Sequence, residues 1–72
     1  MQTLNRHQFD LAVKPLRPAM VKAARARVGQ VWAEDAVQEA LLQAWTIIDR
    51  FDASSGSSAF AAWMREILEI VC

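Results

Sequence analysis

The chain has 72 residues, of which 54% are hydrophobic and 22% charged, and its formal net charge is zero. This hydrophobic content excludes a disordered tail, the two glycines and two prolines exclude collagen-like and low-complexity chains, and the single cysteine excludes an internal disulfide framework or a zinc site built from several thiolates. No apolar run is long enough to span a membrane and residues 1–10 contain no apolar stretch of signal-peptide length, so the sequence predicts a cytoplasmic protein.

Two short helices are predicted in the first part of the chain. Apolar residues placed among polar ones predict a helix over Leu4–Val13. Two prolines follow, and they predict a break near Lys14–Arg17 because a proline ring clashes with the preceding turn of a helix. A second helix is expected to begin near Pro18, since proline suits the first turn, and to end at Gly29, a favourable C-cap residue.

The third predicted helix runs from about Ala33 to Arg50, with Glu34 and Asp35 in its first turn. At about 100° per residue, one side is apolar and consists of Val37, Ala40, Leu41, Ala44, Trp45, Ile47, Ile48 and Phe51. The opposite side is polar except for Leu42, and it contains an outward patch of Asp35, Gln38, Glu39, Leu42 and Thr46. This patch is either a solvated helix face with a stray leucine or a polar-rimmed docking site for a partner helix with basic residues.

A loop and a fourth helix complete the chain. Residues 51–58 are loop-forming by composition, and Ser57 or Ser58 is expected to cap the helix that follows. That helix is predicted over Ala59–Cys72, with an apolar face of Phe60, Trp63, Met64, Ile67, Leu68, Ile70 and Val71 and a narrow polar stripe of Arg65, Glu66 and Glu69. Because the pattern ends at Cys72 without a cap, the chain is expected to be a fragment whose terminal helix promotes self-association.

These elements predict an all-α fold, a small bundle of three to four helices in one domain over residues 1–72. The charges divide along the sequence, since residues 1–30 carry six Lys or Arg against one Asp, and residues 31–72 carry two Arg against seven Asp or Glu. The two halves either attract and pack together or serve two different partners.

The sequence offers little support for catalysis. The one histidine, His7, lies in a polar context typical of a solvated side chain, and the serines have no histidine partner near them in the sequence. Glu34, Asp35 and Glu39 are possible metal ligands, but no second ligand cluster accompanies them, and Cys72 is expected to act as a small hydrophobic residue. We therefore predict a binding protein with no cofactor and no enzymatic activity.

Three segments together resemble region 2 of bacterial sigma-70 family factors, and most closely the extracytoplasmic-function class. They are AEDAVQEALLQAW at 33–45, DRFD at 49–52 and SAFAAWM at 58–64, and the similarity extends over roughly Leu11–Cys72. The family's separate region 4 domain has no counterpart in the chain. The resemblance implies that the third helix docks on the clamp helices of the largest RNA polymerase subunit. Asp35, Gln38 and Glu39 match the family's docking pattern, and Leu42 adds an apolar centre.

The resemblance also implies a role in opening promoter DNA. In the family, the loop after the docking helix and the next helix bind the minus-ten element and capture a base flipped from the non-template strand. The corresponding residues here are Phe51, Ser54, Ser55, Ser57, Ser58 and Arg65. Core packing is the alternative role for Phe51, and it is the favoured role for Phe60 and Trp63.

The terminal helix departs from the family's usual pattern at positions that matter for DNA. Glu66 replaces a basic residue, Ile70 replaces a polar residue that faces DNA, and Glu69 adds a further negative charge. Carboxylates repel the phosphate backbone. Two interpretations follow: a sigma region 2 domain that binds polymerase and promoter DNA, or a sigma-like module that binds polymerase or an anti-sigma protein without reading DNA. A plain helical scaffold or dimerisation unit is a third.

Overall fold

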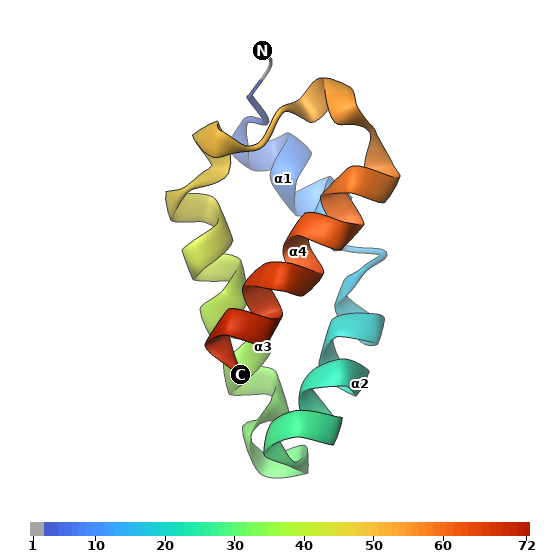
Figure 1. The fold of residues 1–72 in the computed structure, drawn as a ribbon, viewed down its shortest axis with the longest axis vertical. Helices are drawn as coiled ribbons and strands as arrows, with labels where there is room; N and C mark the ends of the chain where they lie inside the picture. Colours follow the sequence, from blue (N-terminus) through green and yellow to red (C-terminus); the bar gives the residue numbers. More distant parts are fainter. Residues whose placement is uncertain (1–2) are drawn as a thin grey trace.

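The computed structural model describes residues 3–72, and every regular element in this range is a helix (Figure 1). Its four α-helices are α1 (Arg6–Val13), α2 (Arg17–Val28), α3 (Gln30–Thr46) and α4 (Ser57–Val71). Two short 3₁₀ helices, η1 (Ile48–Arg50) and η2 (Ala53–Ser55), lie in the connection between α3 and α4. The all-α prediction is therefore confirmed, and no described helix has both the length and the apolar character needed to cross a membrane.

Local chemistry fixes where α1 and α2 begin. Asn5 forms a capping box, in which its Oδ1 accepts from the Gln8 N–H at 2.8 Å and its own N–H donates to the Gln8 Oε1 at 3.0 Å. This cap places the start of α1 at Arg6 rather than at Leu4, the predicted start. The predicted break follows α1, and Pro18 lies in the first turn of α2, where its missing N–H costs no helical hydrogen bond.

Gly29 joins α2 to α3 without an intervening loop. It is the C-cap of α2, as predicted, and also the N-cap of α3, with φ 85° and ψ 167°. Residues with a side chain rarely adopt this conformation. Because one glycine serves both helices, α3 begins at Gln30 instead of Ala33, so the prediction that Glu34 and Asp35 occupy its first turn was wrong.

The end of α3 also differs from the prediction. The helix stops at Thr46, whose Oγ1 donates to the Gln43 carbonyl at 2.7 Å, and Ile47 leaves helical geometry at φ −118° and ψ 22°. Residues 48–50 continue only as η1. After the connection, Gly56 at φ 95° is the N-cap of α4, and neither Ser57 nor Ser58 caps the helix, because both lie inside it.

The core lies where α4 crosses the antiparallel pair of α2 and α3, with α1 at the end of the molecule that also holds η1 and η2 (Figure 1). Alanines line much of α3's buried side, which lets neighbouring helices approach closely. Within residues 3–72 the core consists of Phe9, Val13, Met20, Ala24, Ala33, Val37, Ala40, Ala44, Ile48, Phe51, Phe60, Met64, Ile67 and Leu68. Leu41, Trp45, Ile47, Trp63 and Val71 are half-buried against it.

Ile70 is the clearest error in the predicted core, since 84% of it is exposed. The buried stripe of α4 follows Phe60, Met64 and Ile67, and at about 100° per residue Ile70 lies well to one side of that stripe. The predicted polar stripe of Arg65, Glu66 and Glu69 is exposed as expected.

Within residues 3–72, two ion pairs connect the basic half of the chain to the acidic half. Arg17 approaches Glu34 at 3.9 Å, and Arg27 approaches Glu69 at 3.5 Å, with all four side chains at least 40% exposed. Exposed pairs of this kind contribute about 0–1 kcal/mol each, so burial of the apolar core holds the halves together far more than their charges do.

Candidate functional site

The outward face of α3 is the most distinctive polar surface on the described chain. Asp35, Gln38, Glu39, Leu42 and Thr46 are all exposed, as the spacing predicted. Leu42 is 52% exposed and lies between polar neighbours on this face. We call Asp35, Gln38, Glu39 and Leu42 the α3 surface. The helix holds these four side chains together because residues three and four apart lie one above the other.

The α3 surface is negative and its charges are available to a partner. The helix contains three carboxylates and no Lys or Arg. Glu34 pairs with Arg17, but Asp35 has no hydrogen bond or ion pair within residues 3–72, and Glu39 accepts only a 3.5 Å contact from the Gln43 amide. An apolar side chain flanked by such carboxylates matches a partner helix that carries basic residues beside an apolar one.

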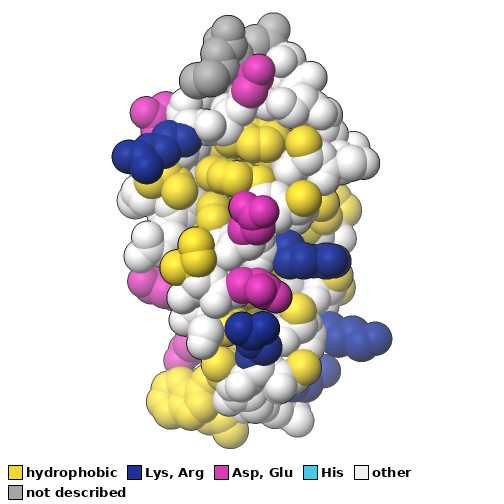
Figure 2. Space-filling view, viewed as in Figure 1, with side chains coloured by type: hydrophobic (Ala, Val, Ile, Leu, Met, Phe, Trp, Pro, Cys, Tyr) yellow, Lys and Arg dark blue, Asp and Glu magenta, His cyan; other side chains and the backbone are white. Residues whose placement is uncertain are grey.

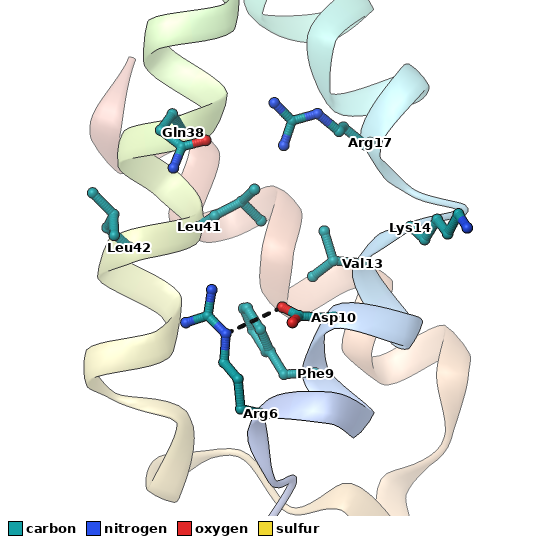
Figure 3. Close-up of a pocket in the computed structure, with 9 residues that line it drawn as sticks. All are labelled: Arg6, Phe9, Asp10, Val13, Lys14, Arg17, Gln38, Leu41 and Leu42. Atoms are coloured by element: carbon teal, nitrogen blue, oxygen red, sulfur yellow. Dashed lines mark ion pairs between the residues drawn. The ribbon is translucent and has the colours of Figure 1, made fainter.

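A groove runs beside the α3 surface, between α3 and the α1–α2 segment (Figure 3). It encloses about 310 Å³, and its lining residues are Arg6, Phe9, Asp10, Val13, Lys14, Arg17, Gln38, Leu41 and Leu42. Two members of the α3 surface, Gln38 and Leu42, thus form one wall. No local pattern in the sequence predicts this groove, because it depends on the packing of α1 against α3.

Arg6 lines this groove, and its Nε lies 3.3 Å from the Asp10 carboxylate (Figure 3). Its guanidinium also lies 5.1 Å from the centre of the Trp45 ring. A cation held both by a carboxylate and over an aromatic face loses mobility. The contact of Arg6 with Trp45 adds to the packing of α1 on α3, which rests mainly on the buried Phe9, whose ring centre lies 5.3 Å from that of Trp45.

Phe51, one of the expected DNA-contacting residues, is buried with 7% of its surface exposed. Its ring centre lies 5.3 Å from that of Phe60 and 5.1 Å from that of Trp63. Phe60 is buried and Trp63 half-buried, in agreement with the core roles favoured for them. In this structure Phe51 therefore packs in the core, which was the alternative role for this side chain, because the turn after η1 directs it towards α4.

The serines of the connection lie at the surface beside the start of α4. Ser55, Ser57 and Ser58 are exposed, and the carboxylate of Asp52 shapes the segment by accepting from the Ser54 N–H at 3.1 Å and from its hydroxyl at 2.8 Å. Gly56 supplies no side chain to cap α4. The first N–H groups of α4 therefore lack a side-chain cap and lie beside the hydroxyls of Ser57 and Ser58. Such an arrangement attracts hydrogen-bond acceptors and anions.

Arg65 lies two turns further along α4 on the same side as Ser58, because seven residues separate them. It is exposed and borders a groove shared with Ala23 and Arg27 of α2. Glu69 occupies the next turn, but its charge is partly balanced by Arg27 at 3.5 Å. Ser58 and Arg65 thus lie on one face of α4. Glu66 lies beside them as an exposed carboxylate that has no ion pair in the described chain.

Residues 3–72 contain no group of three or more His, Cys, Asp or Glu side chains placed to hold a metal ion. His7 is exposed and Cys72 is half-buried at the end of α4. The two best-defined polar surfaces of the described chain are the α3 surface and the start of α4.

Comparison with known proteins supplies one match. A family model described as Sigma-70 region 2 matches residues 12–69, which include α2, α3 and the connection, and nearly all of α4. No curated protein and no solved structure matches the chain.

Proposed function

Because the chain belongs to the sigma-70 family through its region 2, a domain of transcription initiation factors that binds RNA polymerase core, we propose that it docks on the polymerase through the α3 surface. The observation that carries this proposal is the pair of available carboxylates, Asp35 and Glu39, on the same helix face as the exposed Leu42. The same helix carries the Asp-x-x-Gln-Glu spacing that the family uses for this contact. We further propose that the chain is of the extracytoplasmic-function class and acts in the cytoplasm.

Photocrosslinking tests the docking proposal. A p-benzoylphenylalanine placed at Leu42 replaces one apolar side chain of the α3 surface by another. Irradiation with polymerase core is expected to produce a crosslink to the largest subunit, since docking brings that position against the clamp helices. The same probe at Ala62, which is exposed on α4, is the matched control. Equal crosslinking from both positions, or a main product with another subunit, would contradict docking through α3.

We also propose that the start of α4 takes part in binding the minus-ten element. Support comes from the exposed hydroxyls of Ser55, Ser57 and Ser58, from the uncapped N-terminus of α4 and from Arg65 on the same helix face as Ser58. These groups suit the phosphates and flipped base of a single strand. Because Arg27 partly balances the charge of Glu69, Glu66 is the carboxylate of α4 that opposes DNA without an ion pair in the described chain.

The Glu66→Lys variant is predicted to bind a single-stranded oligonucleotide carrying a minus-ten element more tightly than the unmodified chain does. Its affinity should also depend more steeply on salt, by about 0.7 in log–log slope for each new phosphate contact. Fluorescence anisotropy at several salt concentrations measures both quantities. Glu34→Lys is the matched control, because it changes the net charge equally on another helix. An equal gain from the two variants would show a net-charge effect and count against a DNA site on α4.

A second candidate function is a module that binds polymerase or an anti-sigma protein without reading promoter DNA. The exposed carboxylate of Glu66 and the 84% exposure of Ile70 favour it, since both residues lie on the helix that would face DNA. Polymerase binding by the unmodified chain, with no DNA binding by either the unmodified chain or Glu66→Lys, would select this function.

A further inference from the structure

Two adjacent hydrophobic residues at the start of α3 are exposed without any role in the core. Val31 is 81% exposed and Trp32 is 62% exposed, and neither belongs to the core or to the half-buried residues packed against it. Figure 2 shows hydrophobic side chains protruding at the end of the molecule where α2 meets α3. A tryptophan contributes a large apolar area. Exposing it beside a valine forgoes the stabilisation that burial would supply.

The register of α3 places both residues in line with the α3 surface. Val31, Asp35, Gln38 and Leu42 follow one another at intervals of four, three and four residues, and Trp32 lies seven residues before Glu39. Such intervals keep side chains on one face of a helix. At about 1.5 Å per residue, Val31 and Leu42 are about 16 Å apart along the helix. The α3 surface therefore has an apolar group at each end, with Asp35 and Glu39 between them.

We propose that Val31 and Trp32 form the apolar anchor of the α3 surface and that the occupant is a basic amphipathic helix of the polymerase. This inference rests on the proposed docking function and specifies the partner helix. That helix carries two apolar side chains about three turns apart, one against Trp32 and one against Leu42, with Lys or Arg between them facing Asp35 and Glu39. Trp32 is the expected energetic centre, since tryptophan is enriched among interface residues whose loss costs most.

The negative charge of the α3 surface favours a basic helix as its occupant over a second copy of the chain or an anionic membrane. A symmetric contact between two copies through this face would place Asp35 and Glu39 of one copy near the same carboxylates of the other. An anionic membrane surface would meet the same repulsion. A basic helix, in contrast, pairs with Asp35, which has no ion pair or hydrogen bond within the described chain.

The test measures binding of the full chain, labelled at its N-terminus, to RNA polymerase core by fluorescence anisotropy. Trp32→Ala is expected to weaken binding about tenfold or more, and Trp32→Phe, which keeps an aromatic ring, is expected to weaken it much less. Ile70→Ala is the control, because it truncates an exposed apolar side chain outside the α3 surface, and it should leave the dissociation constant unchanged. Circular dichroism is expected to show the same melting temperature for Trp32→Ala and the unmodified chain.

The outcomes separate the anchor from the docking proposal. If the Gln38→Ala/Glu39→Ala variant loses binding while Trp32→Ala binds as the unmodified chain does, the anchor is overturned and docking stands. If the unmodified chain does not bind core at all, the docking proposal falls and the anchor with it. A Trp32→Ala variant that fails to fold would overturn the anchor, since it would show that the ring supports the core. A dimer of the unmodified chain that Trp32→Ala dissociates would overturn it too, by assigning the patch to a second copy.

Discussion

Replacing Phe60 with alanine is expected to destabilise the domain by about 3–5 kcal/mol, a large part of the stability of a domain this small. Phe60 is 4% exposed, and its ring lies 5.3 Å from Phe51, 6.0 Å from Trp63 and 6.1 Å from Phe9, centre to centre. It therefore joins α1, the connection and α4 in one aromatic cluster. Truncation leaves a cavity and removes three ring contacts, each contributing about 0.5–1.5 kcal/mol beyond buried area.

Thermal unfolding followed by circular dichroism measures this effect. In a domain of this size each kcal/mol lowers the melting temperature by about 4–8 °C, so Phe60→Ala should lower it by about 12 °C or more. Ile70→Ala is the control in the same helix, because Ile70 is 84% exposed and its truncation should change stability by about 0.5 kcal/mol or less. Similar melting temperatures for the two variants would contradict the placement of Phe60 at the centre of the aromatic cluster.

Reversing the two available charges of the α3 surface is expected to abolish binding to polymerase core. In Asp35→Lys/Glu39→Lys, two cations would replace the carboxylates that face the basic partner, and like charges brought together at an interface cost several kcal/mol. The dissociation constant should rise about 100-fold or more. Both positions are exposed, so the melting temperature should stay near that of the unmodified chain. Equilibrium binding to core, measured by anisotropy, reports the loss.

The control for this variant is Glu66→Lys/Glu69→Lys, which makes the same change in net charge on α4. It is expected to keep core binding within a few-fold of the unmodified value, because α4 lies outside the α3 surface. Equal losses from the two double variants would show that net charge, not the α3 surface, determines binding. Binding by Asp35→Lys/Glu39→Lys at full affinity would contradict a basic partner.

Much of this fold follows from short-range patterns in the sequence. The 3.6-residue period separated the buried side of α3, including Val37, Ala40 and Ala44, from the exposed Asp35 and Gln38. A single favourable residue, Gly29, correctly marked the end of α2. These features depend on neighbours within one or two turns, so the sequence alone predicts them.

Features that depend on distant contacts were less predictable. Val31 and Trp32 lie before the predicted start of α3, and their exposure depends on which residues of other helices pack against this first turn. Ile70 is apolar but lies beside the buried stripe of α4, so its exposure depends on the direction in which α4 crosses α3.

The candidate surfaces likewise combine features that one helix determines with features that depend on contacts between helices. The helical period placed Gln38 and Leu42 outward, because one helix alone determines that face. The burial of Phe51 required the positions of Phe60 and Trp63 on α4, and the groove beside Leu42 required the packing of α1.

Binding of RNA polymerase core by the α3 surface is tested most directly by a pull-down of core with the unmodified chain and with Gln38→Ala/Glu39→Ala. Both side chains are exposed, so circular dichroism should show the two proteins equally folded. We predict that the unmodified chain retains core and that the double variant does not. Failure of the folded, unmodified chain to retain core, or equal retention by both proteins, would contradict docking through the α3 surface.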